Sequence, residues 1–197
     1  MILAPLILVS GPSGSGKSTL IREVVAQARM PLRLAISATT RPARSGEIDG
    51  IDYHFWTPER FQQRLAEGAF LEHAQIHGKH YYGTPRSEVD GYREKGIGVI
   101  LDIDVQGAAQ VRPLFPDHLS IFVRLSNREN YAQRLRQRGT DSEETIARRM
   151  ETATRELERT NEYQYVILND DLQSAVLQFL ELIERHRHGT QGDEDAR

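Results

Sequence analysis

Short runs of apolar residues recur along the chain, separated by longer segments of mixed polarity. The clearest runs cover residues 6–9, 99–103, 121–125 and 165–168, with a weaker one at 34–36. A run that is apolar at every position is typical of a strand buried on both faces of a sheet. We therefore predict a strand at each of these places.

Between the predicted strands, apolar residues return every three or four positions, as they do on one face of a helix. Positions 20, 21, 24, 25 and 28 predict a helix that begins near residue 18, and further helices are expected at 58–68, 127–138 and 142–162. Thr57 and Pro58 suit an N-cap and a first helical position, and Asp171 suits the cap of a last helix. Asp141 and Glu144 make an acidic start for the helix at 142–162. The polar segment 189–197 is expected to be a flexible tail.

Strands that alternate with helices indicate an α/β fold, with a doubly wound parallel sheet covered by helices on both faces. In such folds ligands bind at the carboxyl ends of the strands. The segments that follow residues 9 and 103 are therefore expected to lie side by side.

Composition narrows the class of protein. The 197 residues, 39% of them apolar, are enough for one domain with its own core. There are 25 Lys and Arg against 28 Asp and Glu, a formal charge of −3, which argues against a general nucleic-acid binder. No cysteine is present, which excludes disulfides and thiolate nucleophiles and suits the cytoplasm. No apolar run is long enough to span a membrane, and residues 1–9 are interpreted as a buried strand rather than a signal peptide.

A glycine-rich loop follows the first predicted strand. It matches the pattern G-x-x-x-x-G-K-[ST] and consists of Gly11, Pro12, Ser13, Gly14, Ser15, Gly16, Lys17 and Ser18. The glycines let backbone N–H groups point at phosphate oxygens, and the helix that follows adds its positive N-terminal end. Lys17 can reach the β- and γ-phosphates, and the Ser18 hydroxyl can bind Mg²⁺. The loop indicates a nucleoside triphosphate, but it does not separate a GTPase, an ATPase and a small-molecule kinase.

A second candidate phosphate site lies between residues 37 and 53. Arg41 and Arg44 are three residues apart, Tyr53 follows, and Pro42 favours an extended backbone at Arg41. Two arginines can converge on one phosphate, because the planar guanidinium matches its oxygens. On these residues alone, a solvated basic loop is an equally good interpretation.

Two further sets of charged residues are candidates for the same site. Asp102 and Asp104 alternate at the carboxyl end of a predicted strand, which puts them on one face, although either could simply cap the next helix. Arg134 and Arg138 share a helical face, and Arg149 follows on the next helix. Taken alone, these arginines are better interpreted as ion-pair partners of nearby glutamates on a solvated pair of helices.

An ordered set of motifs resembles the guanylate kinase family. It comprises S-x-x-T-R-x-x-R-x-G-E at 37–47 with Tyr53 after it, FLE at 70–72, YYGT at 81–84, LDIDVQG at 101–107, the arginine segment 134–139 and NDD at 169–171. The resemblance covers about residues 4–185. It implies an ATP:GMP phosphotransferase that requires Mg²⁺, with a core at about 4–36, 86–126 and 151–185. It also implies a GMP-binding insertion at about 37–85 and a mobile lid at about 127–150.

The resemblance implies a role for each candidate residue. The GMP phosphate is assigned to Arg41, Arg44, Tyr53 and Tyr82, within a signature that includes Glu47, and the guanine base to Ser37, Glu72, Thr84 and Asp104. The lid residues Arg134, Arg138 and Arg149 are expected to close on the ATP phosphates, and Asn169 to contact the adenine ring. Asp102 is expected to support Mg²⁺ through water, together with Ser18. His80 looks like an extra residue before the tyrosine pair, which leaves open whether Tyr81 or Tyr82 reaches the phosphate.

The chemistry of guanine agrees with these assignments. Its N1–H and N2–H₂ donors suit a carboxylate such as Glu72, whereas adenine would turn a bare acceptor toward it. Two alternatives remain open. One is a kinase for another acceptor on the same scaffold, such as a sugar phosphate. The other is a scaffold module of similar shape that binds protein partners, against which the intact phosphate loop and the lid arginines argue.

Overall fold

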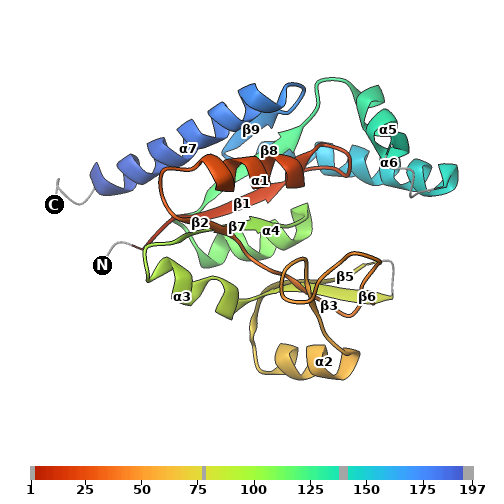
Figure 1. The fold of residues 1–197 in the computed structure, drawn as a ribbon, viewed down its shortest axis with the longest axis horizontal. Coiled ribbons are helices and arrows are strands. Elements are labelled where there is room, and N and C mark those ends of the chain that lie inside the picture. Colours follow the sequence, from red (N-terminus) through yellow and green to blue (C-terminus); the bar gives the residue numbers. More distant parts are fainter. Residues whose placement is uncertain (1–2, 77–78, 138–141, 193–197) are drawn as a thin grey trace.

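The computed structural model describes residues 3–76, 79–137 and 142–192. A five-stranded parallel sheet forms the core, as the sequence predicts (Figure 1). In spatial order its strands are β2 (Leu32–Leu34), β7 (Gly98–Asp102), β1 (Leu6–Ser10), β8 (Leu119–Arg124) and β9 (Tyr165–Leu168). Because β1 lies at the centre, the loop that follows it opens at the carboxyl edge of the sheet, between the ends of β7 and β8.

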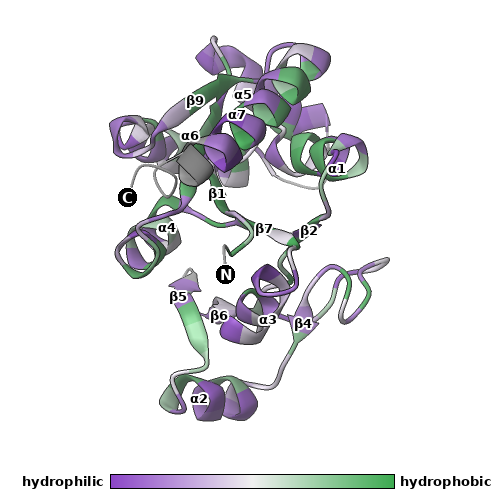
Figure 2. Cartoon of the chain, turned by 90° about the vertical axis from the view of Figure 1, so that its left-hand side faces the viewer, coloured by the Kyte–Doolittle hydropathy of each residue, from purple (hydrophilic) through white to green (hydrophobic). Residues whose placement is uncertain are grey.

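Two hydrophobic clusters explain why the strands are apolar at every position. Ile7 and Val9 pack with α1 (Lys17–Gln27) and α7 (Leu172–Gly192) on one face of the sheet. Leu6 and Leu8 point the other way and pack with α4 (Val105–Val111). Since successive side chains of a strand face opposite sides, both sets of positions must be apolar. The covering helices carry hydrophobic and hydrophilic residues together, as Figure 2 shows.

A second, four-stranded sheet lies below the core sheet in Figure 1. We call it the insertion sheet. Its order is β4 (His54–Phe55), β3 (Ala38–Thr39), β6 (His80–Pro85) and β5 (Phe70–Ile76). Only β3 and β4 pair in parallel, and β6 pairs antiparallel with β3 and with β5. The pattern of apolar residues does not predict these four strands.

The insertion sheet has a small aromatic core of its own. Helix α2 (Pro58–Ala66) begins where the sequence predicts, because the Thr57 side chain accepts a hydrogen bond from the Arg60 N–H and Pro58 opens the helix. Phe61 of this helix stacks on Phe70, with ring centroids 4.4 Å apart. This cluster holds α2 against the strands independently of the main core.

Two helices form an arm above the carboxyl edge of the core sheet, α5 (Arg128–Gln137) and α6 (Glu143–Leu157) (Figure 1). Ser142 caps α6 through a hydrogen bond from the Thr145 N–H, whereas the predicted acidic start at Asp141 lies outside the described residues. The prediction of a single helix over 142–162 is wrong at its C-terminal end, because α6 stops at Leu157. After α6 the chain forms the separate 3₁₀ turn η3 (Thr160–Glu162).

Other element boundaries shift by a few residues. Strand β2 covers 32–34 rather than 34–36, because its pairing with β7 sets Leu32 opposite Gly98 and Leu34 opposite Ile100. Helix α7 is capped by Asp171, as predicted, and continues to Gly192, past the start of the expected tail at Gly189. Residues 193–197 lie outside the described part. The remaining short elements are η1 (Arg86–Glu88), α3 (Asp90–Arg93) and η2 (Arg112–Leu114). No helix of 3–76, 79–137 or 142–192 has the length and apolar character that crossing a membrane requires.

Candidate active site

The phosphate loop joins β1 to α1 and lies against β8. A Cβ on Gly11 would stand 2.1 Å from the carbonyl oxygen of Val123, so only glycine permits this approach. Gly16 has a φ of 82°, and a Cβ on it would lie 2.5 Å from Nδ2 of Asn169. Helix α1 begins at the next residue, which places its N-terminal N–H groups beside the loop.

Lys17, Ser18 and Asp102 meet where β1 and β7 end. The ammonium of Lys17 pairs with Oδ1 of Asp102, and Oγ of Ser18 donates to Oδ2 of the same carboxylate at 3.3 Å. Burial lowers the pKa of Lys17 to about 8, although the carboxylates of Glu156 and Asp104 raise it. The Lys17 side chain keeps 17% of its surface exposed. The predicted proximity of the two strand ends is confirmed.

A cavity of about 400 Å³ opens beside the loop, under the helical arm. Asn169, only 3% exposed, donates from Nδ2 to the carbonyl oxygen of Ser15 at 2.8 Å. Arg134 donates to the carbonyl oxygens of Ser15 at 3.3 Å and of Asn169 at 3.0 Å. These contacts brace the loop and line the cavity. Its lining comprises Gly14, Gly16, Thr19, Arg134, Gln137, Asn169, Asp170 and Leu172.

The three predicted lid arginines have different positions. Arg134 lines the cavity beside the loop. Arg149 is half-buried on α6 and lines neither this cavity nor the second one, which is described next. Arg138 lies outside the described residues.

A second cavity, of about 190 Å³, lies between the insertion sheet and the end of β7. Six of the predicted acceptor-site and metal residues line it, together with Ala74, Gly83 and Ile103. These six are Ser37, Tyr53, Glu72, Tyr82, Asp102 and Asp104. Since Asp102 also contacts Lys17 and Ser18, this cavity adjoins the phosphate loop.

Glu72 is the buried carboxylate of the second cavity. Its side chain accepts a hydrogen bond from Oγ1 of Thr84 at 2.7 Å, and Oγ of Ser37 lies 3.5 Å from the same hydroxyl. Burial raises the pKa of Glu72 to about 7, with a contribution from the charge of Asp104, against the hydrogen bond from Thr84. A Cβ on Gly107 of α4 would stand 2.8 Å from Oε2 of Glu72, so a glycine there makes room for the carboxylate.

Arg41 has an internal partner. Its guanidinium donates to both carboxylate oxygens of Glu47, at 2.9 and 2.8 Å, and the N–H of Arg44 donates to the same carboxylate at 2.7 Å. These two donors lower the pKa of Glu47 to about 2. Glu47 therefore neutralises the charge of Arg41, a role that its place in the sequence motif does not reveal.

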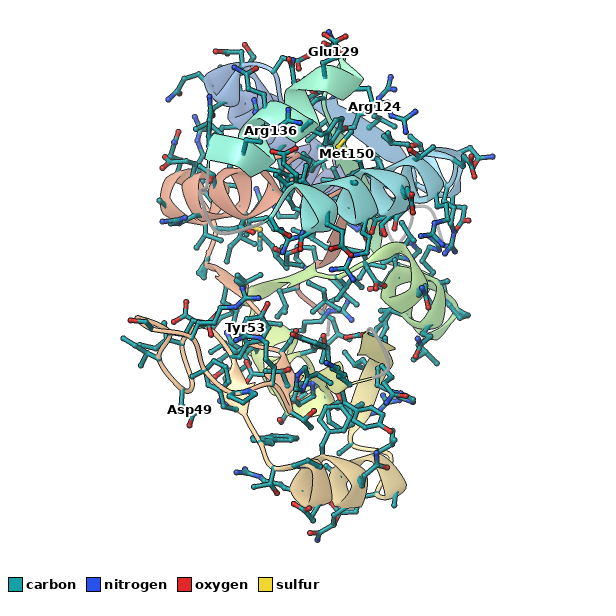
Figure 3. The ribbon with its side chains drawn as sticks, turned by 90° about the vertical axis from the view of Figure 1, so that its right-hand side faces the viewer. Asp49, Tyr53, Arg124, Glu129, Arg136 and Met150 are labelled. Carbon is teal, nitrogen blue, oxygen red and sulfur yellow. The ribbon has the colours of Figure 1, made fainter. Side chains whose placement is uncertain are left out.

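Tyr81 and Tyr82 make different contacts. Oη of Tyr82 accepts a hydrogen bond from Nε of Arg41 at 3.2 Å, and the Tyr82 ring meets Tyr53 at a centroid distance of 6.0 Å. Tyr81 instead stacks on Phe61 at 5.5 Å, within the aromatic core of the insertion sheet. Thus Tyr82 is the tyrosine that faces the arginine. Figure 3 shows Tyr53 in the insertion and Arg136 and Met150 on the helical arm above it.

Asp104 has both of the roles that the sequence leaves open, helix capping and a place in the candidate site. Its Oδ1 caps α4, accepting from the N–H groups of Gln106 at 2.9 Å and of Gly107 at 2.8 Å. The residue also lines the second cavity. Capping thus holds the carboxylate in place at the cavity wall.

Glu156 is a residue that sequence reasoning missed. It lies in the last turn of α6, where burial and the charge of Asp104 raise its pKa to about 7, against the charges of Lys17 and Arg155. No motif marks it, since one glutamate among several on a charged helix carries no signal. Only the fold brings it near the loop.

Comparison with known proteins gives one answer. The family model described as guanylate kinase matches residues 4–186. The guanylate kinase of Fusobacterium nucleatum is 44% identical over 184 residues, which cover 93% of this chain and 98% of that protein. That of Syntrophotalea carbinolica is 47% identical over 178 residues, or 90% and 84% of the two chains. The crystal structure of guanylate kinase from Anaplasma phagocytophilum superposes with a TM-score of 0.72 at 28% identity, covering 94% of this chain and 87% of that one. This chain therefore belongs to the guanylate kinase family, the ATP:GMP phosphotransferases.

Proposed function

We propose that the cavity beside the phosphate loop takes ATP, that the second cavity takes GMP, and that the phosphoryl group passes between them at Lys17. One observation carries this assignment. Asp102 lines the second cavity and also contacts Lys17 and Ser18, whereas Gly14, Gly16 and Thr19 line the first, so the phosphate loop and the start of α1 lie between the two cavities. Phosphates bound in the two cavities would meet there.

Guanine is recognised through Glu72 in this proposal. The carboxylate would accept from N1–H and N2–H₂ of the base, while the hydroxyl of Ser37 would donate to O6, because Thr84 gives its one hydroxyl proton to Glu72. Thr84 already bonds Glu72 at 2.7 Å, so the carboxylate is oriented before the base arrives. Adenine would place an acceptor against this carboxylate and leave it unpaired, which can reject a substrate by roughly 10⁴-fold.

The GMP phosphate is proposed to bind Arg41, Arg44, Tyr53 and Tyr82. Arg41 and Tyr82 are already joined at 3.2 Å, and Tyr53 lies beside Tyr82. A phosphate would share or replace the contact between Arg41 and Glu47, because the guanidinium fork serves phosphate and carboxylate alike. The internal ion pair thus holds Arg41 close to the place where the phosphate is needed.

On the ATP side, the proposed contacts are those of the loop Gly11–Ser18, with Arg134 and Asn169 around the cavity and Arg138 and Arg149 on the arm. Phosphoryl transfer requires positioning and positive charge more than covalent help. Lys17 and the arginines supply that charge, and no general base has to be found. Closure of the arm and the insertion would exclude water, which would otherwise hydrolyse ATP.

Ser18 and Asp102 are the proposed supports for Mg²⁺. A hydroxyl and a carboxylate 3.3 Å apart are hard oxygen donors, which fits an ion that keeps most of its water ligands. When bound, the ion would neutralise charge on the β- and γ-phosphates. The cytoplasmic location expected from the sequence stays a prediction.

The test is a coupled assay of ADP release with ATP, Mg²⁺ and each of GMP, AMP, CMP and UMP in turn. We expect strong turnover with GMP alone. Comparable turnover with AMP would contradict recognition through Glu72. Turnover with a sugar phosphate instead of any nucleotide would point to another acceptor on the same scaffold.

A further inference from the structure

Glu88 joins the core sheet to the insertion sheet. It ends η1, where the chain returns to the core after β6. Its Oε2 accepts from the guanidinium of Arg33 at 2.7 Å and from the N–H of Ile36 at 3.2 Å, and its Oε1 lies 3.0 Å from Nε2 of His54. Arg33 belongs to β2 of the core, His54 to β4 of the insertion, and Ile36 to the connection between β2 and β3. One carboxylate on the returning connection therefore contacts a strand of each sheet and the outgoing connection between them.

The ion pair at this junction is well fixed. Arg33 also donates to the carbonyl oxygen of Glu88 at 2.8 Å, and its guanidinium lies 3.7 Å above the ring of Tyr92. The side chains of Glu88 and Arg33 are only 13% and 19% exposed, whereas those of the surface pair Arg64–Glu67 are 42% and 43% exposed. Removing one partner of a partly buried pair leaves the other charge poorly solvated, so the loss is larger than at the surface.

The residues that Glu88 contacts are chain neighbours of the proposed GMP contacts. Ile36 directly precedes Ser37, on the base side, and His54 directly follows Tyr53, on the phosphate side. The N–H of His54 also donates to the carbonyl oxygen of Ser37 at 2.9 Å. Glu88 itself is not part of the lining of the second cavity, so any effect on GMP passes through these neighbours.

We propose that Glu88 is a positioning residue for GMP, which fixes the insertion sheet at the angle that turns the base-side and phosphate-side groups toward the phosphate loop. The inference rests on the proposed function, because it takes Ser37 and Tyr53 as GMP contacts. Phosphoryl transfer needs the reacting atoms within about 3–3.5 Å, and a displacement of about 1 Å can cost roughly 100-fold in rate. A tilt of the insertion sheet by a few degrees about the Glu88 junction would displace the far side of the second cavity by a comparable distance.

A second tie makes this role separable from folding. Gln110 of α4 exchanges two hydrogen bonds with the backbone of His73 in β5, at 3.2 and 3.0 Å, on the opposite edge of the insertion sheet. Loss of the Glu88 contacts would leave the sheet attached at this edge, able to tilt. We therefore expect an effect on GMP use and not loss of the fold.

The test compares Glu88→Gln with the matched control Glu67→Gln, which removes the same charge from the exposed pair on α2. We expect kcat/KM for GMP to fall roughly tenfold or more in the Glu88 variant, with KM for ATP within about twofold of the unaltered protein. The control should match the unaltered protein in both. Equal GMP kinetics in the two variants, or equal losses for ATP and GMP, would overturn the proposal.

His54 supplies a second pair of variants if Glu88→Gln does not fold. His54→Gln keeps a side-chain donor for the carboxylate, whereas His54→Ala removes it. The proposal expects weaker GMP use in the Ala variant and recovery in the Gln variant. Unchanged GMP kinetics in the Ala variant, or equal losses in both, would overturn it.

Hydrogen exchange separates this inference from the proposed function. Without ligand, the amides of residues 36–37 and 53–55 should exchange faster in Glu88→Gln than in Glu67→Gln, whatever the acceptor is. Unchanged exchange would overturn the positioning role. Failure of the unaltered protein to phosphorylate GMP would overturn the proposed function instead.

Discussion

The two cavities on either side of the phosphate loop are built from different parts of the chain. The cavity proposed for ATP is shaped by backbone, since glycines allow the loop to lie against β8 and the carbonyl oxygens of Ser15 and Asn169 are held by polar side chains. The site proposed for GMP is shaped by side chains that pair with one another. Glu72 bonds Thr84, and Arg41 bonds Glu47.

This difference sets what a ligand has to do on each side. The loop conformation is held by the close approach of Gly11 to Val123 and by hydrogen bonds to the Ser15 carbonyl oxygen, so its N–H groups are expected to need little rearrangement. In the proposed GMP site, the phosphate would share Arg41 with Glu47, which already pairs with it. Substitutions beside the loop should therefore reduce the rate, and substitutions in the second cavity should reduce affinity and specificity for GMP.

The largest effect is expected for Lys17→Ala. Turnover should fall by roughly 10³-fold, because the transferred phosphoryl group loses a cation that stabilises its charge. The fold should persist, since Lys17 is not part of the hydrophobic clusters, and circular dichroism would check this. Lys95→Ala, at an exposed lysine, is the control. Near-normal turnover in a folded Lys17 variant would refute its role.

Next in size is the effect of Arg41→Ala on GMP. KM for GMP should rise by roughly 100-fold, because a bidentate contact to the phosphate is lost, while KM for ATP should stay within about twofold. Arg64→Ala, in the exposed pair of α2, removes the same charge elsewhere in the insertion. Steady-state kinetics with each substrate varied in turn gives both constants. If the KM values for ATP and GMP rise together, the division between the two sides is wrong.

A smaller effect concerns stability and pH. The pKa of Glu72 is about 7 in the folded protein and ordinary in the unfolded chain, so the folded state binds the additional proton between about pH 4.5 and 7. Stability from this group is therefore present at low pH and is lost as the pH rises through 7. Glu72→Gln should stabilise the protein at pH 8, by up to about 3 kcal/mol, and should bring little gain at pH 4.5.

Urea unfolding of the Glu72→Gln variant and the unaltered protein at both pH values would measure this effect. Glu67→Gln controls for loss of a surface charge. A difference between Glu72→Gln and the unaltered protein that does not change with pH would show that the buried carboxylate carries no such cost. Glu156 also titrates near pH 7, but it is present in both proteins and largely cancels from the comparison.

The smallest expected signal is closure. Arg44 on the insertion and Arg134 on the arm carry like charges, which are expected to oppose closure until both substrates bind. The radius of gyration should be smallest with GMP, an unreactive ATP analogue and Mg²⁺ together. Small-angle scattering would measure it, with distance probes at the exposed Ser45 and Gln133 as a check. Equal radii and equal probe distances with and without both ligands would contradict closure from two sides.

The core strands could be predicted because burial on both faces leaves a local signal. Every residue of β1 is buried, and β7 is buried at four consecutive positions, so the apolar runs are continuous. The insertion strands leave no such signal. β3 and β4 have two residues each, and β6 contains a glycine and ends in a proline, so their pairing depends on contacts between distant segments.

The candidate site was predictable to a similar degree. The phosphate loop is contiguous in sequence, and motif spacing identifies it. Glu47 reaches Arg41 across a turn whose shape the sequence does not reveal, and Glu156 reaches the neighbourhood of Lys17 only through the packing of α6. Such contacts join residues that are arranged by the fold and not by local spacing.

The proposed function depends most on selection of guanine over adenine by the second cavity. Its most direct test gives the protein ATP, Mg²⁺ and an equimolar mixture of GMP and AMP, and follows GMP, AMP and GDP by chromatography as the reaction proceeds. Competition in one vessel yields the ratio of the two kcat/KM values without separate constants. We expect GMP to be converted to GDP while AMP remains, with a kcat/KM ratio of roughly 10⁴ in favour of GMP. Consumption of AMP at a rate comparable to that of GMP would contradict it.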